Sequence, residues 1–191
     1  MKQYIIYLPG LGDHWDTPRR FALNFWRIFG VKTELVPMQW YDGKSYDEKL
    51  DRVLTSIDAA VAAGYTVSLI GESAGGSMAA NVYALRAEQL HRVVTLCGVV
   101  YPQAEVSPVI YARSPGFKTS MSKLSDSIEA ITAKNSPDFR VITALHDSVV
   151  SHRQNVLHTK KPIRVWSIGH LTTIALCLTL FSPIIIRQIK K

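Results

Sequence analysis

Short apolar runs alternate along this chain with longer segments of helical periodicity, and this alternation limits the fold more than any other feature. Fully buried parallel strands are continuous apolar runs of this kind, and helices that cover a sheet carry one apolar stripe. The sequence predicts six strands, at residues 4–8, 33–38, 66–70, 93–100, 141–145 and 163–168. Because helical segments separate most of these runs, we expect an α/β fold with three α/β/α layers and a mostly parallel six-stranded sheet.

Local signals locate the predicted helices. Thr17-Pro18 is typical of a helix start, and this first helix would run through Phe21, Phe25, Ile28 and Phe29 and stop at Gly30. The next helix would begin with a capping box in which Ser45 and Glu48 satisfy each other's free amides, and it would end at Gly64. The remaining helices are predicted at 74–90, 124–133, 151–157 and from residue 171 onward.

The chain has 191 residues, of which 47% are hydrophobic. This length suits one domain, and the composition excludes a disordered chain. There is no internal repeat and no linker, so we expect a single domain over residues 1–191. The stretch 102–138 interrupts the alternation with four prolines, and we expect an irregular loop or flap there apart from the helix at 124–133.

Basic residues exceed acidic ones, 22 against 15, which gives a formal net charge of +7. They are scattered, with pairs only at Lys160-Lys161 and Lys190-Lys191, and there is no nucleic-acid-binding motif. We therefore expect a solvated basic surface and no nucleic-acid partner. Cys97 and Cys177 lie in apolar runs without metal-ligand spacing, which favours buried free thiols over a disulfide.

The C-terminal stretch 171–186 is apolar and is the one candidate for membrane insertion. It is shorter than the roughly 20 residues that a span requires, and it contains three threonines and Pro183. We expect a buried terminal helix, no stable membrane insertion and a cytoplasmic protein. The alternative is a membrane-attached protein that uses this stretch together with the Lys190-Lys191 end.

Directly after the apolar run 66–70, the residues Gly71-Glu72-Ser73-Ala74-Gly75 have the pattern G-x-S-x-G. A serine at the tip of a tight strand-to-helix turn has strained backbone angles, and glycines two residues before and after it let neighbouring backbone approach. The helix that follows directs its amides at negative charge that develops on a reacting oxygen. The position between a buried strand and an Ala-rich helix favours a nucleophile elbow over a glycine-rich helix entry that only packs closely.

A serine nucleophile requires a base within hydrogen-bond reach and an acid that orients this base. Asp147 lies just beyond the predicted strand 141–145, and His170 lies just beyond the predicted strand 163–168. The C-terminal ends of parallel strands meet at one edge of the sheet. We therefore expect Ser73, Asp147 and His170 to meet there as nucleophile, acid and base.

Other carboxylates and histidines compete for these roles. Asp13 and Asp42 also follow predicted strands, but the position after the later strand favours Asp147. His146 is adjacent to Asp147 in sequence, so its side chain should point elsewhere. His14 follows the loop after the first strand and is a candidate substrate contact, whereas surface positions are expected for His91, His152 and His158.

On these residues the chain resembles a small α/β-hydrolase. Residues 71–75 resemble the nucleophile elbow of that family, 146–150 resemble its acid segment, and Gly169-His170 resembles its histidine segment. The resemblance extends over nearly the whole chain. The family's usual first hairpin of two strands has no counterpart in this sequence. The resemblance therefore implies a minimal α/β-hydrolase fold.

Pro9-Gly10-Leu11-Gly12 resembles the oxyanion loop of the family, with proline where many members carry histidine. The resemblance implies that the backbone amides of Leu11 and Ala74 hold the oxyanion. Because these donors are main-chain groups, a different side chain at Pro9 does not remove them.

These features predict a serine hydrolase that cleaves a carboxylic ester or related acyl bond of a small to medium substrate through an acyl-enzyme. This chemistry requires no metal or organic cofactor. Trp40 and Tyr41, after the second predicted strand, join His14 as candidate substrate-lining residues. Two alternatives remain: a thioesterase or acyltransferase on the same three residues, and a hydrolase-fold protein with little catalysis that serves as a binding module.

Overall fold

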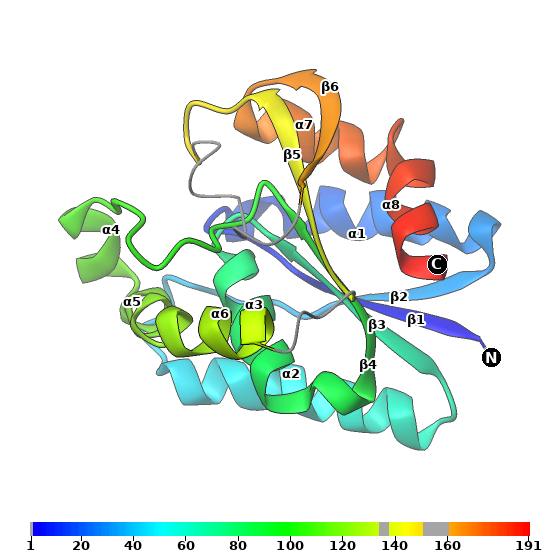
Figure 1. The fold of residues 1–191 in the computed structure, drawn as a ribbon, viewed down its shortest axis with the longest axis horizontal. Coiled ribbons are helices and arrows are strands. Elements are labelled where there is room, and N and C mark those ends of the chain that lie inside the picture. Colours follow the sequence, from blue (N-terminus) through cyan, green and yellow to red (C-terminus); the bar gives the residue numbers. More distant parts are fainter. Residues whose placement is uncertain (1, 134–137, 151–160) are drawn as a thin grey trace.

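A parallel sheet forms the centre of the molecule (Figure 1). The computed structural model describes residues 2–133, 138–150 and 161–191. The strands are β1 (Gln3–Leu8), β2 (Val31–Leu35), β3 (Thr66–Glu72), β4 (Leu90–Leu96), β5 (Phe139–His146) and β6 (Ile163–Ile168). Their order is β2-β1-β3-β4-β5-β6, and every neighbouring pair is parallel. The predicted α/β class and its six strands are confirmed, although β2 and β4 begin earlier than the apolar runs indicated.

Helices cover both faces of the sheet, which gives three layers (Figure 1). One face carries α1 (Asp16–Phe25), α7 (His170–Leu178) and α8 (Ser182–Lys190), and the other carries α2 (Tyr46–Ala62), α3 (Gly75–Arg86), α5 (Pro115–Ser122) and α6 (Leu124–Ala133). Alternate strand residues point to opposite faces of the sheet. Ile5 and Ile70 therefore pack in the core under α1, α7 and α8, while Ile6 and Leu69 pack in the core on the other face. The shorter helices are η1 (Asp13–Trp15), η2 (Trp26–Phe29), η3 (Ala87–Gln89) and α4 (Pro108–Arg113).

The connections leave β1 and β3 in opposite directions across the sheet. β1 continues through α1 to β2 on one side, and β3 continues through α3 to β4 on the other. In open parallel sheets, ligands bind outside the C-terminal ends of the strands where the connections diverge in this way. The loop after β1 and the turn after β3 therefore lie at the position that the topology favours for a site.

The predicted capping box of α2 is confirmed, since Ser45 Oγ accepts the Glu48 amide at 3.2 Å and Glu48 Oε2 accepts the Ser45 amide at 2.9 Å. The predicted start of α1 at Thr17-Pro18 is wrong. This helix begins at Asp16, and its N-cap position is Trp15, which makes no side-chain cap.

The first helix also buries a different face from the one that its phenylalanines indicated. Leu23 and Trp26 pack in the core, and the buried Arg19 lies on the same side. Phe21, Phe25 and Ile28 are exposed, because they lie on the side of the helix away from Leu23. Of the predicted stripe, Phe29 is the residue that packs against the core. α1 ends at Phe25, and η2 continues the chain to Gly30, whose φ of +70° closes it.

The stretch 102–138 is more regular than its prolines predicted. Besides the expected helix α6, it forms α4 and α5, which begin at Pro108 and Pro115. Proline is well tolerated in the first turn of a helix because that turn's amides have no intrahelical partner. α5 and α6 pack against α2 and α3, so this part of the chain belongs to a helical layer instead of an irregular flap.

The predicted single terminal helix is divided into α7 and α8, with Pro183 in the first turn of α8. Ile185, Ile189 and Cys177 are buried in the core that the sheet forms with α1, α7 and α8. Among the described residues, no single helix is both long and apolar enough to cross a membrane; α7 and α8 reach that length and hydropathy only together, across a bend of 67°. The helix predicted at 151–157 lies outside the described residues.

Candidate active site

Ser73 occupies the turn between β3 and α3 with a φ of +49°, in the left-handed region that non-glycine residues seldom adopt. Two backbone hydrogen bonds hold it there. Its amide donates to the Leu96 carbonyl at 3.1 Å, and its carbonyl accepts the Val99 amide at 3.0 Å. The neighbouring strand β4 and the residues after it thus fix the serine at the C-terminal edge of the sheet.

The two glycines of the G-x-S-x-G pattern allow the close packing that this turn requires. A Cβ atom at Gly75 would overlap the carbonyl oxygen of Leu8, and one at Gly71 would lie 2.5 Å from the carbonyl oxygen of Gly75. Glycine at position 75 therefore lets the turn sit directly against the end of β1, and glycine at position 71 lets the start of α3 approach β3. The contact with β1 also brings Ser73 next to the loop that follows this strand.

Asp147, His170 and Ser73 form a continuous series of hydrogen bonds. His170 Nδ1 lies 2.7 Å from Asp147 Oδ2, and His170 Nε2 lies 3.0 Å from Ser73 Oγ. Asp147 follows β5, and His170 begins α7 after Gly169, whose φ of +92° reverses the chain at the end of β6. Three segments that are distant in sequence thus place their polar side chains at one edge of the sheet.

The surroundings of Asp147 keep its carboxylate charged. Burial raises the pKa of this carboxyl, but the hydrogen bond from His170 and the amides of Val150 and Val149 lower it further, so the pKa lies below its ordinary value of 3.8. Both amides donate to Oδ1 at 2.9 Å, which leaves Oδ2 for the imidazole. A charged, oriented carboxylate favours the tautomer in which His170 Nδ1 is protonated and Nε2 accepts a proton from Ser73.

Residues 9–12, which we call the oxyanion loop, are held in place by a buried cluster around Glu72. Glu72 accepts hydrogen bonds from the Tyr7 hydroxyl at 2.5 Å, from Arg19 Nε at 2.7 Å and from the Gly10 amide at 3.4 Å. A terminal nitrogen of Arg19 also pairs with Glu72, and the other donates to the Gly12 carbonyl at 2.6 Å. Burial and the Glu72 carboxylate raise the pKa of Tyr7 well above its ordinary value of 10.0, so its hydroxyl remains a donor.

The two predicted oxyanion donors belong to segments next to Ser73. Leu11 belongs to the oxyanion loop, whereas Ala74 follows the serine at the N-cap of α3. Within the described part of the chain, neither amide donates to a backbone carbonyl, while the Gly10 amide is directed at Glu72. The role of the Leu11 and Ala74 amides as oxyanion donors stays a prediction.

No protein-family model matches the sequence, and no curated protein matches it. Solved structures do match the fold. A structure from the study of LipS and LipT, two metagenome-derived lipolytic enzymes, has a TM-score of 0.69 at 10% identity and covers 97% of this chain and 90% of its own. Est1E from Butyrivibrio proteoclasticus has a TM-score of 0.69 at 14% identity, over 99% and 88% of the two chains. An alpha/beta superfamily hydrolase from Oenococcus oeni PSU-1 has a TM-score of 0.64 at 12% identity, over 100% and 94%.

The chain has the α/β-hydrolase fold. The loop that the sequence resemblance matched to the family's oxyanion loop follows β1, at the C-terminal edge of the sheet. Identities of 10–14% show this fold alone, so the chemistry of the α/β-hydrolase site has to be argued from its own residues.

The three predicted substrate-lining residues of this α/β-hydrolase fold lie in different surroundings. Trp40 is fully buried, and its indole N–H donates to the Pro9 carbonyl at 3.0 Å. It supports the oxyanion loop from the core and presents no surface to an open pocket. Tyr41 is partly exposed beneath the Arg113 guanidinium, and His14 is exposed beside the Trp15 ring.

Residues that competed for the acid and base roles lie elsewhere. Asp42 pairs with Lys49 at 2.6 Å and with Arg52 at 3.3 Å. His91 lies near the start of β4, at the opposite edge of the sheet from Ser73, and His146 is exposed at the end of β5. His152 and His158 lie outside the described residues.

Cys97 lies beside Asp147 and His170, which the sequence pattern had not indicated. One ligand-type atom from each of the three residues lies within 4.8 Å of the others. Burial and the Asp147 carboxylate raise the pKa of the Cys97 thiol. Cys97 and Cys177 are buried and free, as predicted. The available signal was topological, because Cys97 follows β4 just as Asp147 follows the adjacent strand β5.

Proposed function

We propose that this chain is a serine hydrolase that cleaves a carboxylic ester or a related acyl bond. One observation carries the proposal, namely the hydrogen-bonded series from Asp147 through His170 to Ser73, with the serine on a strained turn between β3 and α3. This is the arrangement that makes a serine hydroxyl nucleophilic near neutral pH. The lipolytic enzymes among the similar structures support the reaction class by analogy of fold.

In the first half of the reaction, Ser73 Oγ attacks the carbonyl carbon of the substrate and His170 Nε2 takes the hydroxyl proton. The contact of 3.0 Å between these two atoms is within the range for direct proton transfer. The Asp147 carboxylate, 2.7 Å from Nδ1, stabilises the imidazolium that results. The carbonyl oxygen becomes an oxyanion and accepts hydrogen bonds from the Leu11 and Ala74 amides.

Collapse of the tetrahedral intermediate breaks the bond to the leaving group, which receives its proton from His170. The acyl group is then bonded to Ser73. Water attacks this acyl-enzyme, His170 accepts a proton from the water, and the acid product leaves as the Ser73 hydroxyl is restored. All groups in these steps belong to the chain, the substrate or water.

A fluorophosphonate probe tests the proposal directly, because it reacts only with an activated serine. We expect wild-type protein to be labelled at Ser73 and to hydrolyse aryl esters with small to medium acyl groups. Ser73→Ala should abolish both, and His170→Ala should slow both by about 10³-fold or more.

Two neighbouring residues provide matched controls. Ser148 and His146 are exposed at the same edge of the sheet, so Ser148→Ala and His146→Ala should keep labelling and hydrolysis close to wild type. A folded wild-type protein that is not labelled would contradict the hydrolase and favour a binding module. Hydrolysis of thioesters in preference to matched oxygen esters, or acyl transfer to an added alcohol, would indicate the thioesterase or acyltransferase alternative.

A further inference from the structure

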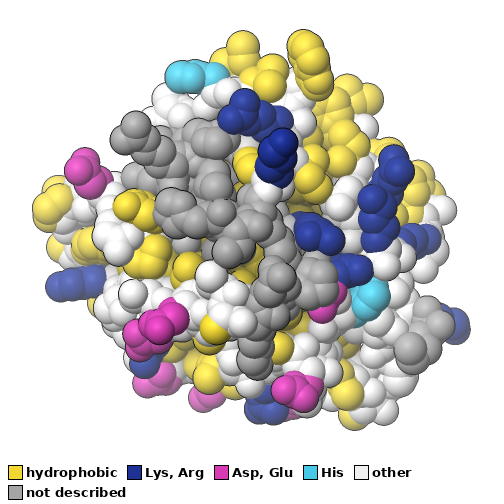
Figure 2. Space-filling view, in the orientation of Figure 1, with side chains coloured by type: hydrophobic (Ala, Val, Ile, Leu, Met, Phe, Trp, Pro, Cys, Tyr) yellow, Lys and Arg dark blue, Asp and Glu magenta, His cyan; other side chains and the backbone are white. Residues whose placement is uncertain are grey.

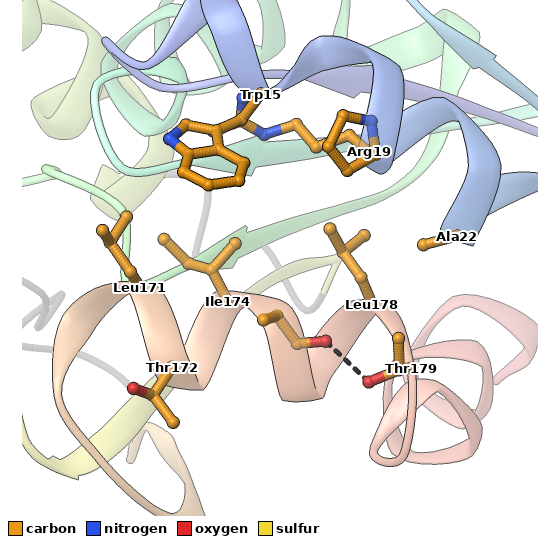
Figure 3. Close-up of a pocket in the computed structure, with 10 residues that line it drawn as sticks. Trp15, Arg19, Ala22, Leu171, Thr172, Ile174, Leu178 and Thr179 are labelled. Carbon is orange, nitrogen blue, oxygen red and sulfur yellow. Dashed lines mark hydrogen bonds between the residues drawn. The ribbon is translucent and has the colours of Figure 1, made fainter.

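An apolar groove of about 430 Å³ lies between α1 and α7, on the face of the sheet that also carries α8. Figure 3 shows its two walls: Trp15, Arg19 and Ala22 face Leu171, Ile174 and Leu178. Its volume is within the range of pockets that hold small-molecule ligands. In Figure 2, exposed hydrophobic side chains gather at the upper right, over the part of the molecule that contains α7, α8 and α1 in Figure 1.

Most of the groove lining is hydrocarbon, and the polar groups of Arg19 and Thr179 are engaged elsewhere. Arg19 is the one charged residue among the described residues of the lining. Its guanidinium is occupied by Glu72 and the Gly12 carbonyl, so its methylene groups face the groove. The Thr179 hydroxyl donates to the Ala175 carbonyl at 2.7 Å (Figure 3). A charged ligand would lose its hydration in this groove, and the Arg19 guanidinium, which is already paired with Glu72, would not compensate for that loss.

The groove is open to solvent, and small side chains form the middle of its walls. Trp15 and Leu171 at its rim are 49% and 64% exposed. Between the larger side chains, the walls are formed by Ala22 of α1 and Ala175 of α7. A linear chain that covered these residues would remove apolar surface from water on both sides.

One end of the groove is formed by residues that are linked to the Ser73 site, by sequence or by a hydrogen bond. Leu171 directly follows His170, and the Trp15 amide donates to the carbonyl of Gly12 in the oxyanion loop at 3.0 Å. α1 and α7 both begin at the C-terminal edge of the sheet, where Ser73 lies. From Leu171 to Thr179 the helical rise is about 12 Å, so the groove leads away from the site over that distance.

We propose that the groove between α1 and α7 binds a linear hydrocarbon chain of the substrate while the scissile carbonyl lies at Ser73. The inference rests on the proposed hydrolase function and narrows its substrates to esters that carry a medium-length alkyl chain. The chain belongs either to the acyl group or to the alcohol, and both present the same surface to the groove.

Two series of esters distinguish these sources. In one series the acyl chain grows from two to twelve carbons on a fixed aryl alcohol, and in the other the alcohol grows on a fixed acetyl group. We expect kcat/KM to rise about fourfold for each methylene that enters the groove, in one series only, until the groove is filled.

Variants that fill the groove test its location. Ala22→Phe and Ala175→Phe should lower the ratio of kcat/KM for a ten-carbon chain over a two-carbon chain by at least tenfold. Asn24→Phe adds the same side chain to an exposed position of α1 outside the groove and should leave this ratio as in wild type. An unchanged ratio in both filling variants, with hydrolysis intact, would overturn the groove assignment and leave the hydrolase standing.

Binding without turnover provides the second readout. Ser73→Ala protein should bind decanoate in calorimetry, and the double variant Ser73→Ala/Ala175→Phe should bind it at least tenfold more weakly, whereas Ser73→Ala/Asn24→Phe should not. Equal binding by all three proteins would also overturn the assignment. If wild-type protein is neither labelled nor active but decanoate binding still depends on the groove, the hydrolase proposal is contradicted. The groove would then bind a hydrocarbon chain that is not part of a substrate.

Discussion

The guanidinium of Arg19 and the carboxylate of Glu72 form a buried ion pair that joins the oxyanion loop to the residue before Ser73. Arg19 Nε donates to Glu72 Oε2 at 2.7 Å, and a second nitrogen pairs with Oε1. The same guanidinium holds the Gly12 carbonyl, and Glu72 accepts the Gly10 amide. The pair thus sets the position of the loop relative to the serine, although the two residues are 53 positions apart in the chain.

Replacement of Arg19 by Met should destabilise the protein because it leaves the Glu72 carboxylate buried without its partner. Removal of one member of a buried pair costs about 3–5 kcal/mol, and we expect a loss of that size in the free energy of unfolding in urea. Fluorophosphonate labelling of Ser73 should also slow, since Gly12 loses its donor.

The double variant Arg19→Met/Glu72→Gln is the control for this prediction. Without an unpaired charge, it should be more stable than Arg19→Met alone by at least 1 kcal/mol, as expected for coupled residues. Additive losses from the two substitutions would show that the pair is not coupled.

Trp40→Phe should weaken the support of the oxyanion loop. The substitution removes the indole N–H that donates to the Pro9 carbonyl, and it leaves that buried carbonyl without this donor. We expect a loss of about 1–3 kcal/mol in unfolding free energy and slower labelling of Ser73. Tyr41→Phe, at the exposed neighbour, should change neither measurement; equal effects at the two positions would mean that the Pro9 contact is unimportant.

Gly75→Ala should be costly because the added methyl would overlap the Leu8 carbonyl oxygen, which is backbone and cannot move freely. We expect a loss of about 2–3 kcal/mol or more in thermal or urea unfolding. Gly30→Ala is a useful comparison, since Gly30 has a φ of +70° but no atom near its missing Cβ. It should cost only about 1–2 kcal/mol from backbone strain. A smaller loss at Gly75 than at Gly30 would contradict the tight packing of the turn.

The lowered pKa of Asp147 predicts a loss of stability in acid. In the unfolded chain this carboxyl titrates near 3.8, and in the folded protein its pKa lies lower. Its contribution is therefore complete above pH 3.8 and is lost as the pH falls below that value through the folded pKa. Urea unfolding between pH 6 and pH 3 should show a steeper decline for wild type than for Asp147→Asn. Parallel curves for the two proteins would show that Asp147 has the same pKa in both states.

Much of this fold can be read from local pattern. The apolar runs predict the strands because the central strands β1, β3, β4 and β5 are buried on both faces over most of their length. Ser45 with Glu48 predicts the start of α2 because a capping box needs only neighbouring residues. Glycine spacing around Ser73 predicts the turn after β3, since only glycine fits against Leu8. Strand order then predicts that Asp147 and His170 approach this serine.

Other features were decided by contacts between segments distant in sequence. Phe21 and Phe25 have the apolar character of a core stripe, yet the core selects Leu23 and Trp26 because β2 and α7 lie on that side of α1. The ion pair Arg19–Glu72 and the hydrogen bond from Trp40 to Pro9 have no local sequence signature. The sequence around each residue does not indicate a partner that lies far away in the chain.

The sequence by itself therefore determined the layers, the edge of the sheet at which the polar residues meet and the turn that presents Ser73, since these depend on periodicity and on glycine spacing. Only the tertiary structure decided how the oxyanion loop is held, which face of α1 is buried and that a groove runs between α1 and α7. The features that the sequence determined depend on local backbone conformation and on the burial of each segment. The features that only the tertiary structure decided depend on contacts between charged and apolar groups that are far apart in the chain.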